Sequence, residues 1–390
     1  MKNKFNQFRA FLFLYWAMIL SVTGMYTMYI SDMGFSKKEI SIAVTIYTLS
    51  GLIGQIIIGY IVDKLRQIKN VMAISLVIGL ISAAGLLFIK ENWQIYLMLT
   101  LWGFFISATY TLTDTWCINT LKATNEQRNF GKIRGFGSIG YGFSGVLLGL
   151  LLQSFGWKIY YWYIVLGIIL TLIIMYFIND NSNLDYENSG SSISIKEGLE
   201  EIFKIKPLIV MIVIIFMYNF VVKGIYCYLA ILVSDYGGGV ASLGLTYCFD
   251  ASPEIVTFFL TARLLKKHKS KSIILIAFLL QIIRLSVILV FGNSLAVILM
   301  GILSGFAYGL VAASYKTYIY ELAPEKYKTS CMSISETIIG LSGIASAPIF
   351  GFMFTKFGSN STILFGLIID IILTFVMLTN NILSRKRKTS

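Results

Sequence analysis

Apolar runs separated by short polar breaks follow one another along the whole chain. A helix that crosses the roughly 30 Å hydrocarbon core of a bilayer needs about 20 apolar residues. About twelve runs of this length, joined by short loops, occupy nearly all of the sequence. The predicted transmembrane helices are Phe8–Ile30, Ile40–Val62, Val71–Ile89, Ile95–Leu121, Phe130–Phe155, Trp157–Ile178, Pro207–Val233, Leu243–Leu264, Ser272–Gly292, Leu295–Leu322, Ser330–Phe354 and Thr362–Leu383.

One long polar connection, residues 179–206, divides these runs six and six. It starts with Asn, Ser and Gly and continues with a helical Ile/Leu pattern over Ile195–Ile205. This pattern predicts a flexible linker followed by an amphipathic cytoplasmic helix. The predicted fold is therefore an all-α membrane protein, with one six-helix bundle over residues 1–178. A second, similar bundle over 207–390 ends in a basic cytoplasmic tail.

The two halves echo each other. In each, the fifth run follows a basic loop, is rich in small residues and closes on Phe-Gly, at Phe155-Gly156 and Phe357-Gly358. Repeats packed around a site at mid-membrane are common in secondary carriers. In the first half, the small residues of this run share one helical face, which predicts close helix packing. They are Gly131, Gly135, Ser138, Gly142, Gly145 and Gly149.

Composition excludes several classes of protein. Apolar residues make up 57% of the 390 residues and charged residues 13%, which is too apolar for a soluble domain of this size. No Gly-rich phosphate loop ending in Lys-Ser or Lys-Thr occurs, so ATP hydrolysis is not indicated. The cysteines lie singly in apolar runs, which favours neither a disulfide nor a metal site. The first run has no small-residue cleavage site, and we expect it to be retained as a helix.

The basic residues indicate topology. The net charge is +13, but the Lys and Arg residues lie between apolar runs, so they do not point to a nucleic-acid partner. Alternate loops collect most of them, which places those loops and both termini in the cytoplasm by the positive-inside rule. The other side of the membrane has only Lys37, Lys38, Lys90, Lys158 and Lys356.

The loop after the second predicted helix carries a charged motif, Gly59–Lys69. Its Gly can let two helices approach closely, and its Asp and basic residues can pair across the cytoplasmic face and separate when the halves rock. The motif resembles the signature loop of the major facilitator superfamily, G-x-x-x-D-[K/R]-x-G-x-[K/R]-[K/R]. Arg66 replaces the second Gly and Ile68 replaces one basic residue. The resemblance implies a gating role for Gly59, Asp63, Lys64 and Lys69.

Further stretches resemble one branch of that superfamily, the lactose permease and nucleoside symporter branch. Asp114 precedes Phe130–Tyr141, which reads Phe-Gly-x-x-Arg-x-Phe-Gly-Ser-x-Gly. Glu254-Ile255 precedes two phenylalanines in the eighth run, and Arg284 lies midway along the ninth. Together these matches cover nearly the whole chain. They imply substrate contacts for Asp114 and Arg134 and proton coupling for Glu254 and Arg284.

Differences from this branch limit which substrates the resemblance can imply. Lactose permease carries a His and a proton-binding Glu on helix ten, where this chain has Ser304 and Ala307. Its sugar-stacking Trp is matched by Tyr141, and its helix-seven acids are replaced by Lys223. Lactose itself is therefore not implied. We expect Tyr141 and Lys223 to join the substrate-binding residues.

Charged residues within the predicted helices are candidate functional groups, because a charge at mid-bilayer costs about 3 kcal/mol or more. Lys223 is equally consistent with a structural salt bridge to Asp250 or Glu254, which share one helix face. Side chains nearer helix ends, including Glu336, can instead snorkel or form ion pairs, and Glu336 also competes with Glu254 as the proton site. The candidates are Asp114, Arg134, Lys223, Asp250, Glu254, Arg284, Lys316, Glu336 and Asp370.

These observations favour a secondary transporter over an enzyme or a channel. Intramembrane enzymes use a His, a Ser/Lys pair or clustered metal ligands, whereas the only histidine, His268, lies in a basic loop. No filter loop typical of a channel occurs. We therefore expect uptake of a small polar solute, such as a sugar or nucleoside, with protons. The alternatives are a proton-antiport exporter of drugs or metabolites, disfavoured by the lack of a Gly-Pro motif in helix five, and a non-transporting sensor.

The expected setting is a bacterial-type cytoplasmic membrane, in which the chain is a multi-pass monomer. It requires no cofactor, since the proton gradient drives transport. Solute, protons and lipid are its expected partners, and nucleic acid is not among them.

The topology is open to a direct test. A single cysteine introduced at Ser191, in a variant without the four natural cysteines, should be inaccessible to a membrane-impermeant maleimide in intact cells. Lys158→Cys is the matched control and should be labelled from outside. Labelling of the Ser191 position from outside would contradict the predicted orientation.

Overall fold

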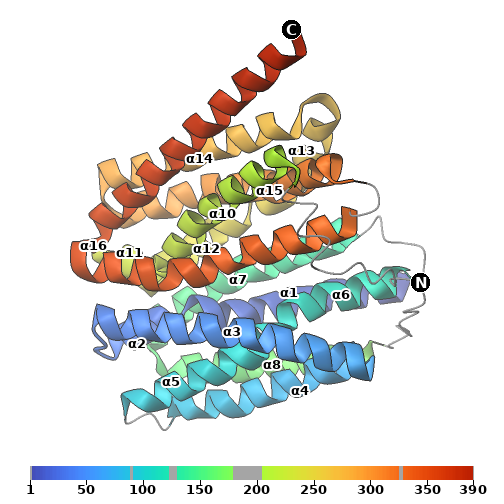
Figure 1. Cartoon of the computed structure of the whole chain (residues 1–390). Helices are drawn as coiled ribbons and strands as arrows, with labels where there is room; N and C mark the ends of the chain where they lie inside the picture. Colours follow the sequence, from blue (N-terminus) through green and yellow to red (C-terminus); the bar gives the residue numbers. More distant parts are fainter. Residues whose placement is uncertain (1, 88–90, 123–129, 179–203, 325–327, 390) are drawn as a thin grey trace.

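The computed structural model describes residues 2–87, 91–122, 130–178, 204–324 and 328–389 (Figure 1). These residues form helices and short connections, with no strand among them. The helices run roughly side by side as one bundle, with the N-terminal half below and the C-terminal half above in Figure 1. Both ends of the chain lie toward the right of that view. We call this end of the bundle the terminal face and the other end the opposite face.

The N-terminal half contains six spans, several of which are built from two or three consecutive helical segments. Its elements are α1 (Lys2–Gly24), α2 (Tyr26–Asp32), α3 (Lys37–Leu65), α4 (Ile68–Ala83), η1 (Ala84–Leu87), α5 (Asn92–Leu101), the π-helical turn η2 (Trp102–Ile106), α6 (Ala108–Lys122), α7 (Phe130–Phe155) and α8 (Lys158–Phe177).

The C-terminal half repeats this arrangement. Its elements are α10 (Lys206–Cys227), α11 (Leu229–Asp235), α12 (Val240–Ala251), α13 (Glu254–Lys267), α14 (Ser270–Phe291), α15 (Ser294–Leu322) and α16 (Lys328–Thr389). The predicted linker helix over Ile195–Ile205 lies almost entirely outside the described residues.

The twelve-span prediction is confirmed. Ten described helical stretches are long and apolar enough to cross a membrane. The last of these, Ile334–Thr379, contains two spans, because α16 reverses direction at Gly358. The eighth span is broken into α12 and α13, each too short to qualify alone. Its break falls at Pro253, because proline lacks a backbone N–H and weakens the helix there.

The Phe-Gly repeats mark equivalent turns of the two halves. Gly156 ends the fifth span with a φ of 68°, and Gly358 ends the eleventh with a φ of 77°. L-residues with a side chain seldom adopt such values, so glycine is required at both turns. The repeated Phe-Gly pair in the sequence therefore corresponds to the same backbone geometry in both halves.

The signature loop ends α3 in an unusual way. Arg66 is the C-cap of α3 with a φ of 54°, and it is the only residue other than glycine with positive φ in the described chain. This is the position at which the superfamily motif has its second Gly. A left-handed C-cap explains that glycine, and Arg66 adopts the same conformation with some strain.

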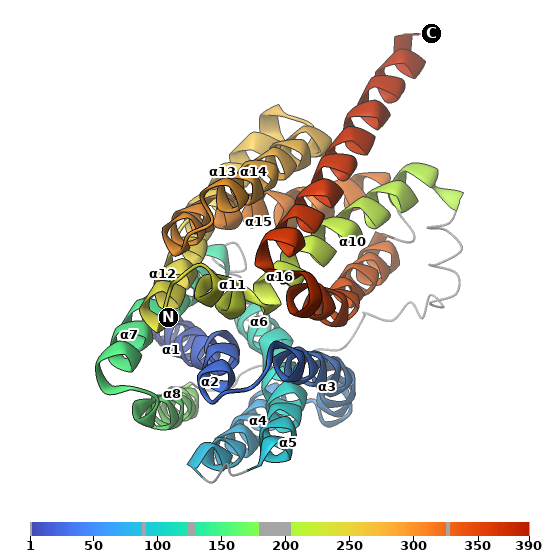
Figure 2. The same cartoon turned by 90° about the vertical axis from the view of Figure 1, so that its left-hand side faces the viewer.

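The halves meet along a seam, which we define as the contact of α7 with α12 and α13 (Figure 2). Gly145 and Gly244 face each other where α7 and α12 cross. A Cβ added at Gly145 would lie 2.6 Å from the carbonyl oxygen of Gly244, and one at Gly244 would meet the carbonyl oxygen of Gly145. The small-residue face of α7 therefore packs directly against the other half.

A second contact joins α3 to α16 near the opposite face. Lys37 Nζ lies 2.6 Å from Asp235 Oδ2, and Ser359 donates a hydrogen bond of 2.5 Å to the same oxygen. Gly351 of α16 lies against Ser41, and Tyr228 donates a hydrogen bond of 3.3 Å to Ser41. All these contacts between the halves lie on the side of the bundle away from the chain ends.

The α7–α12 crossing should be sensitive to a single methyl group. We expect Gly244→Ala to lower the free energy of unfolding by about 1–3 kcal/mol, because the new Cβ forces two backbones apart. Gly239→Ala is the matched control, since a Cβ there meets nothing within 4 Å. The measurement is the melting temperature of the purified protein in detergent. Equal melting temperatures for the two variants would contradict the crossing geometry.

Candidate functional site

Arg134 and Asp114 form an ion pair inside the N-terminal half. Arg134 Nε lies 3.2 Å from Asp114 Oδ1, which joins α7 to α6. Their side chains are 27% and 40% exposed, so the pair is only partly buried. The structure thus brings together two residues that the sequence assigned to solute binding. That role stays a prediction.

An aromatic cluster surrounds this pair. The Arg134 guanidinium carbon lies 4.2 Å from the centre of the Trp16 ring, which is a cation–π contact. Trp16 also stacks on Tyr110 at 6.0 Å and meets the edge of Tyr141 at 6.4 Å. Gly137 makes room for this packing, because a Cβ there would lie 2.5 Å from the Trp16 ring. The buried Trp16 Nε1 has no hydrogen-bond partner among the described residues.

A layer of tyrosines lies between this cluster and the opposite face. Tyr141 and Tyr226 share a hydrogen bond of 2.8 Å between their hydroxyls, across the two halves. Tyr247 contacts both rings, at 5.8 Å and 5.7 Å. Its hydroxyl donates a hydrogen bond of 2.9 Å to the carbonyl oxygen of Gly24. We call Tyr141, Tyr226 and Tyr247 the tyrosine layer.

Glu254 lies in the seam. It starts α13 directly after the break at Pro253, and Ser138 of α7 donates a hydrogen bond of 2.5 Å to Glu254 Oε2. Ser138 follows Arg134 by one helical turn and precedes Tyr141 by another, so the three share one face of α7. The carboxylate of one half therefore lies against the helix face that carries the arginine of the other half.

Lys223 does not pair with either acid considered from the sequence. Its Nζ lies 3.5 Å from the carbonyl oxygens of Ile339 and Gly340 on α16, and no ion pair joins it to Asp250 or Glu254. The lysine therefore links α10 to α16 within the C-terminal half. Its expected contact with solute stays a prediction.

Arg284 is more deeply buried than expected for a residue of the transport path. Only 4% of it is exposed, and its guanidinium donates to Gln281 Oε1 at 3.3 Å. Asp250 and Asp370 are the carboxylates that act on it electrostatically, and it forms no ion pair with Glu254. Asp370 is 1% exposed, and its carboxylate oxygens have no hydrogen-bond partner among the described residues. These groups form a buried polar cluster inside the C-terminal half.

Glu336 forms a third arrangement, between α15 and α16. Tyr315 donates a hydrogen bond of 2.5 Å to its Oε1, and Lys316 Nζ lies 2.9 Å from the same atom. Both partners belong to the same half. The geometry agrees with an inter-helix ion pair, which was one of the two sequence-based alternatives for this residue.

The residues of the signature loop lie at the terminal face. Lys69 donates a hydrogen bond of 2.7 Å to the carbonyl oxygen of Ile178, at the end of α8. Lys64 lies in the last turn of α3, one residue after Asp63. The expected close packing at Gly59 is not found, since a Cβ there would meet nothing within 4 Å. The reason is that α3 approaches the other half at its opposite end.

Several residues of the site were missed by sequence analysis. Trp16, Tyr110 and Tyr226 lie on long apolar runs rich in aromatics, where nothing local marks one ring as special. Lys37 and Asp235 are separated by 198 positions, so their pairing has no local signal either. Ser138 was assigned to packing alone, although it also donates to Glu254. In the described part of the chain, no group of three or more potential metal ligands occurs.

The fold and this polar seam between two six-helix halves are those of a membrane transporter. A family model described as "MFS_1 like family" matches residues 5–367, and the chain belongs to this family of the major facilitator superfamily. The superfamily resemblance stated from the sequence is thereby confirmed. A comparison with curated proteins finds no significant match.

Solved structures show the same fold. The nucleoside transporter NupG has a TM-score of 0.79 at 16% identity, covering 97% of this chain and 98% of that chain. A point mutant of NupG gives 0.81 at 15% identity, covering 96% and 99%. A D-xylose-proton symporter gives 0.69 at 14% identity, covering 96% and 95%. The family and these neighbours are transporters rather than enzymes.

The ion pair can be tested by binding. We expect Asp114→Ala to abolish solute binding and to affect expression less, since it leaves Arg134 without its counter-charge inside the N-terminal half. Arg134→Lys keeps the charge but loses the planar contact with Trp16, and we expect it to weaken binding as well. Binding to the purified protein is measured by scintillation proximity, with the exposed Lys266→Gln as control. Normal binding by Asp114→Ala would refute the assignment.

Proposed function

We propose that the protein is a proton-coupled symporter that takes up a small polar solute, with nucleosides and sugars as the candidate classes. The single observation that carries this proposal is the contact of Glu254 with Ser138. Through this contact the Glu254 carboxyl, the proton site of this proposal, lies against the face of α7 that carries Arg134. Protonation and solute binding therefore take place on one shared helix face.

The chemistry of the N-terminal cluster suits a solute with hydroxyl groups and a flat apolar surface. The Arg134–Asp114 pair offers charged donors and acceptors, and the free Trp16 Nε1 offers a neutral donor. Tyr110 and Tyr141 add ring surfaces beside them. Sugars and nucleosides combine these features, and the structurally similar proteins include a nucleoside transporter and a D-xylose-proton symporter.

Coupling follows from the charges that share the seam. An ionised Glu254 attracts Arg134 from across the seam and so competes with Asp114 for it. Protonation removes that attraction and leaves the Arg134–Asp114 pair available to the solute. Because Glu254 and Arg134 belong to different halves, their separation changes when the halves rock. Only differential binding of this kind can bias a conformational equilibrium.

The present arrangement is one state of an alternating-access cycle. The halves are held together at the opposite face by Lys37–Asp235 and deeper in the bundle by the Gly145–Gly244 crossing. The distribution of Lys and Arg supports a cytoplasmic location of the terminal face. In this state the solute is released toward the cytoplasm, and separation of these contacts opens the site to the outside.

The proposal is tested with Glu254→Gln, which mimics a permanently protonated side chain. In proteoliposomes we expect the variant to lose gradient-driven accumulation of radiolabelled solute while keeping solute exchange across the membrane, because the neutral side chain still accepts from Ser138. The screen covers nucleosides and monosaccharides, with and without a proton gradient.

Glu336→Gln provides the discriminating comparison. It removes a carboxyl of the same type that lies within one half, so accumulation should persist. If accumulation survives in Glu254→Gln and disappears in Glu336→Gln, the proton site lies on α16 and the proposal fails.

A further inference from the structure

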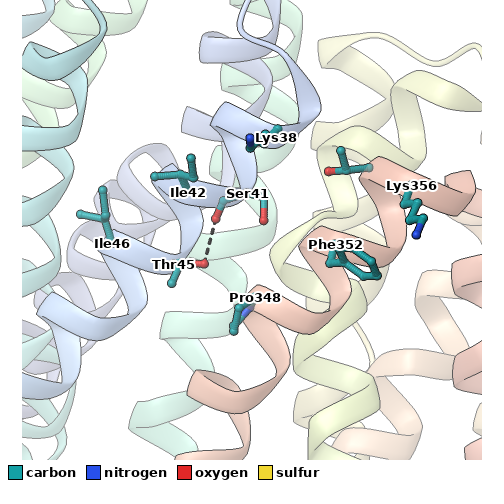
Figure 3. Close-up of a pocket in the computed structure, with 9 residues that line it drawn as sticks. Lys38, Ser41, Ile42, Thr45, Ile46, Pro348, Phe352 and Lys356 are labelled. Atoms are coloured by element: carbon teal, nitrogen blue, oxygen red, sulfur yellow. Dashed lines mark hydrogen bonds between the residues drawn. The ribbon is translucent and has the colours of Figure 1, made fainter.

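A groove of about 460 Å³ lies between α3 and α16 near the opposite face (Figure 3). Its volume is within the range of about 300–1,000 Å³ that is common for small-molecule sites. Figure 2 shows α3 and the first part of α16 side by side at the edge of the bundle, so the groove is at its periphery. It takes no part in the transport site described above.

The lining changes from charged to apolar along the groove. On α3 the groove residues run from Lys38 at the opposite face to Ile46, and on α16 from Lys356 to Pro348. Each stretch covers about 12 Å at 1.5 Å per residue, most of the roughly 15 Å depth of one leaflet. Figure 3 shows Lys38 and Lys356 on the two walls of the groove, with Pro348 below both of them. This polarity gradient is that of a phospholipid lying along the membrane normal.

The two lysines of the groove lack a carboxylate partner in the described chain. Neither Lys38 nor Lys356 forms an ion pair within the described chain, whereas the acids close by are engaged. Asp235 binds Lys37 and Ser359, and Glu39 accepts hydrogen bonds from Ser36 and Asn92. Lys356 Nζ lies 5.4 Å from the centre of the Phe352 ring and 5.5 Å from that of Phe357, and neither contact neutralises its charge. Two unpaired positive charges therefore flank the mouth of the groove.

The location of these charges also needs an explanation. The opposite face is the lysine-poor side of the protein, yet two of its lysines lie at this one groove. The apolar part of the lining is open, with Ile42 42% and Phe352 55% exposed. An acyl chain packs against such a surface, whereas a soluble anion makes no favourable contact with it.

We propose that this groove binds an anionic phospholipid, with the headgroup phosphate between Lys38 and Lys356 and an acyl chain along Ile42, Ile46 and Phe352. Because one wall belongs to each half, the bound lipid bridges α3 and α16 beside the Lys37–Asp235 pair. It therefore stabilises the state in which the halves are joined at the opposite face.

Native mass spectrometry of the purified protein tests the proposal, with palmitoyl-oleoyl phosphatidylglycerol and phosphatidylcholine as probes. We expect the intact protein to prefer phosphatidylglycerol. A lysine near an anionic lipid contributes about fivefold to binding, so Lys38→Gln combined with Lys356→Gln should reduce the preference by about 30-fold. Lys158→Gln, an exposed lysine on the same face, is the matched control and should keep it.

A second measurement follows the conformational consequence. In nanodiscs, phosphatidylglycerol should raise the melting temperature of the wild type over that in phosphatidylcholine, and the double variant should lose this gain. Equal binding of the two lipids, unchanged preference in the double variant, or full competition by glycerol phosphate would each overturn the proposal. The last result would identify a site for free anions instead. Solute uptake is not needed for either readout.

Discussion

The backbone contact between Gly145 of α7 and Gly244 of α12 is the constraint on which the rest of the seam depends. Helices in lipid gain nothing from burying apolar side chains against one another, so close approach must come from small residues. That approach fixes the rotation of α7, and the face that carries the glycines also carries Arg134, Ser138 and Tyr141. A larger residue at the crossing would therefore displace the polar groups as well as the helices.

The charged groups within the helices differ in burial and in the partners that compensate their charge. Arg134 is held by Asp114 and the Trp16 ring, and it remains accessible. Arg284 and Asp370 lie in a buried cluster, with polar atoms that have no partner among the described residues. A buried charge is costly unless it is compensated, so these groups depend on one another inside the C-terminal half. The Arg134–Asp114 pair is, in contrast, partly exposed.

Much of the fold could be predicted from the sequence. Bilayer thickness dictates the length of a spanning helix, and the length of each apolar run indicates that helix directly. The ends of α7 coincide with the predicted Phe130–Phe155, and the break at Pro253 follows from the missing N–H. The site was predicted less completely. Family motifs pointed to Arg134 and Asp114, but no periodicity reveals which ring of an apolar run faces the seam, so Trp16 was missed. Long-range pairs such as Lys37 with Asp235 depend on how the two halves dock.

The tyrosine layer has an electrical consequence. A membrane that stores energy as an ion gradient must not contain a continuous water path, and each leaking charge is driven by about 2.3 kcal/mol per 100 mV. Tyr141, Tyr226 and Tyr247 fill the space between the polar cluster and the opposite face with ring contacts, and their hydroxyls are already bonded to each other or to Gly24. Few hydroxyl groups of the layer therefore remain to form hydrogen bonds with a continuous chain of water molecules. The layer thus limits the leakage of ions through the protein. Its hydroxyl hydrogen bonds are weak enough to break when the halves separate.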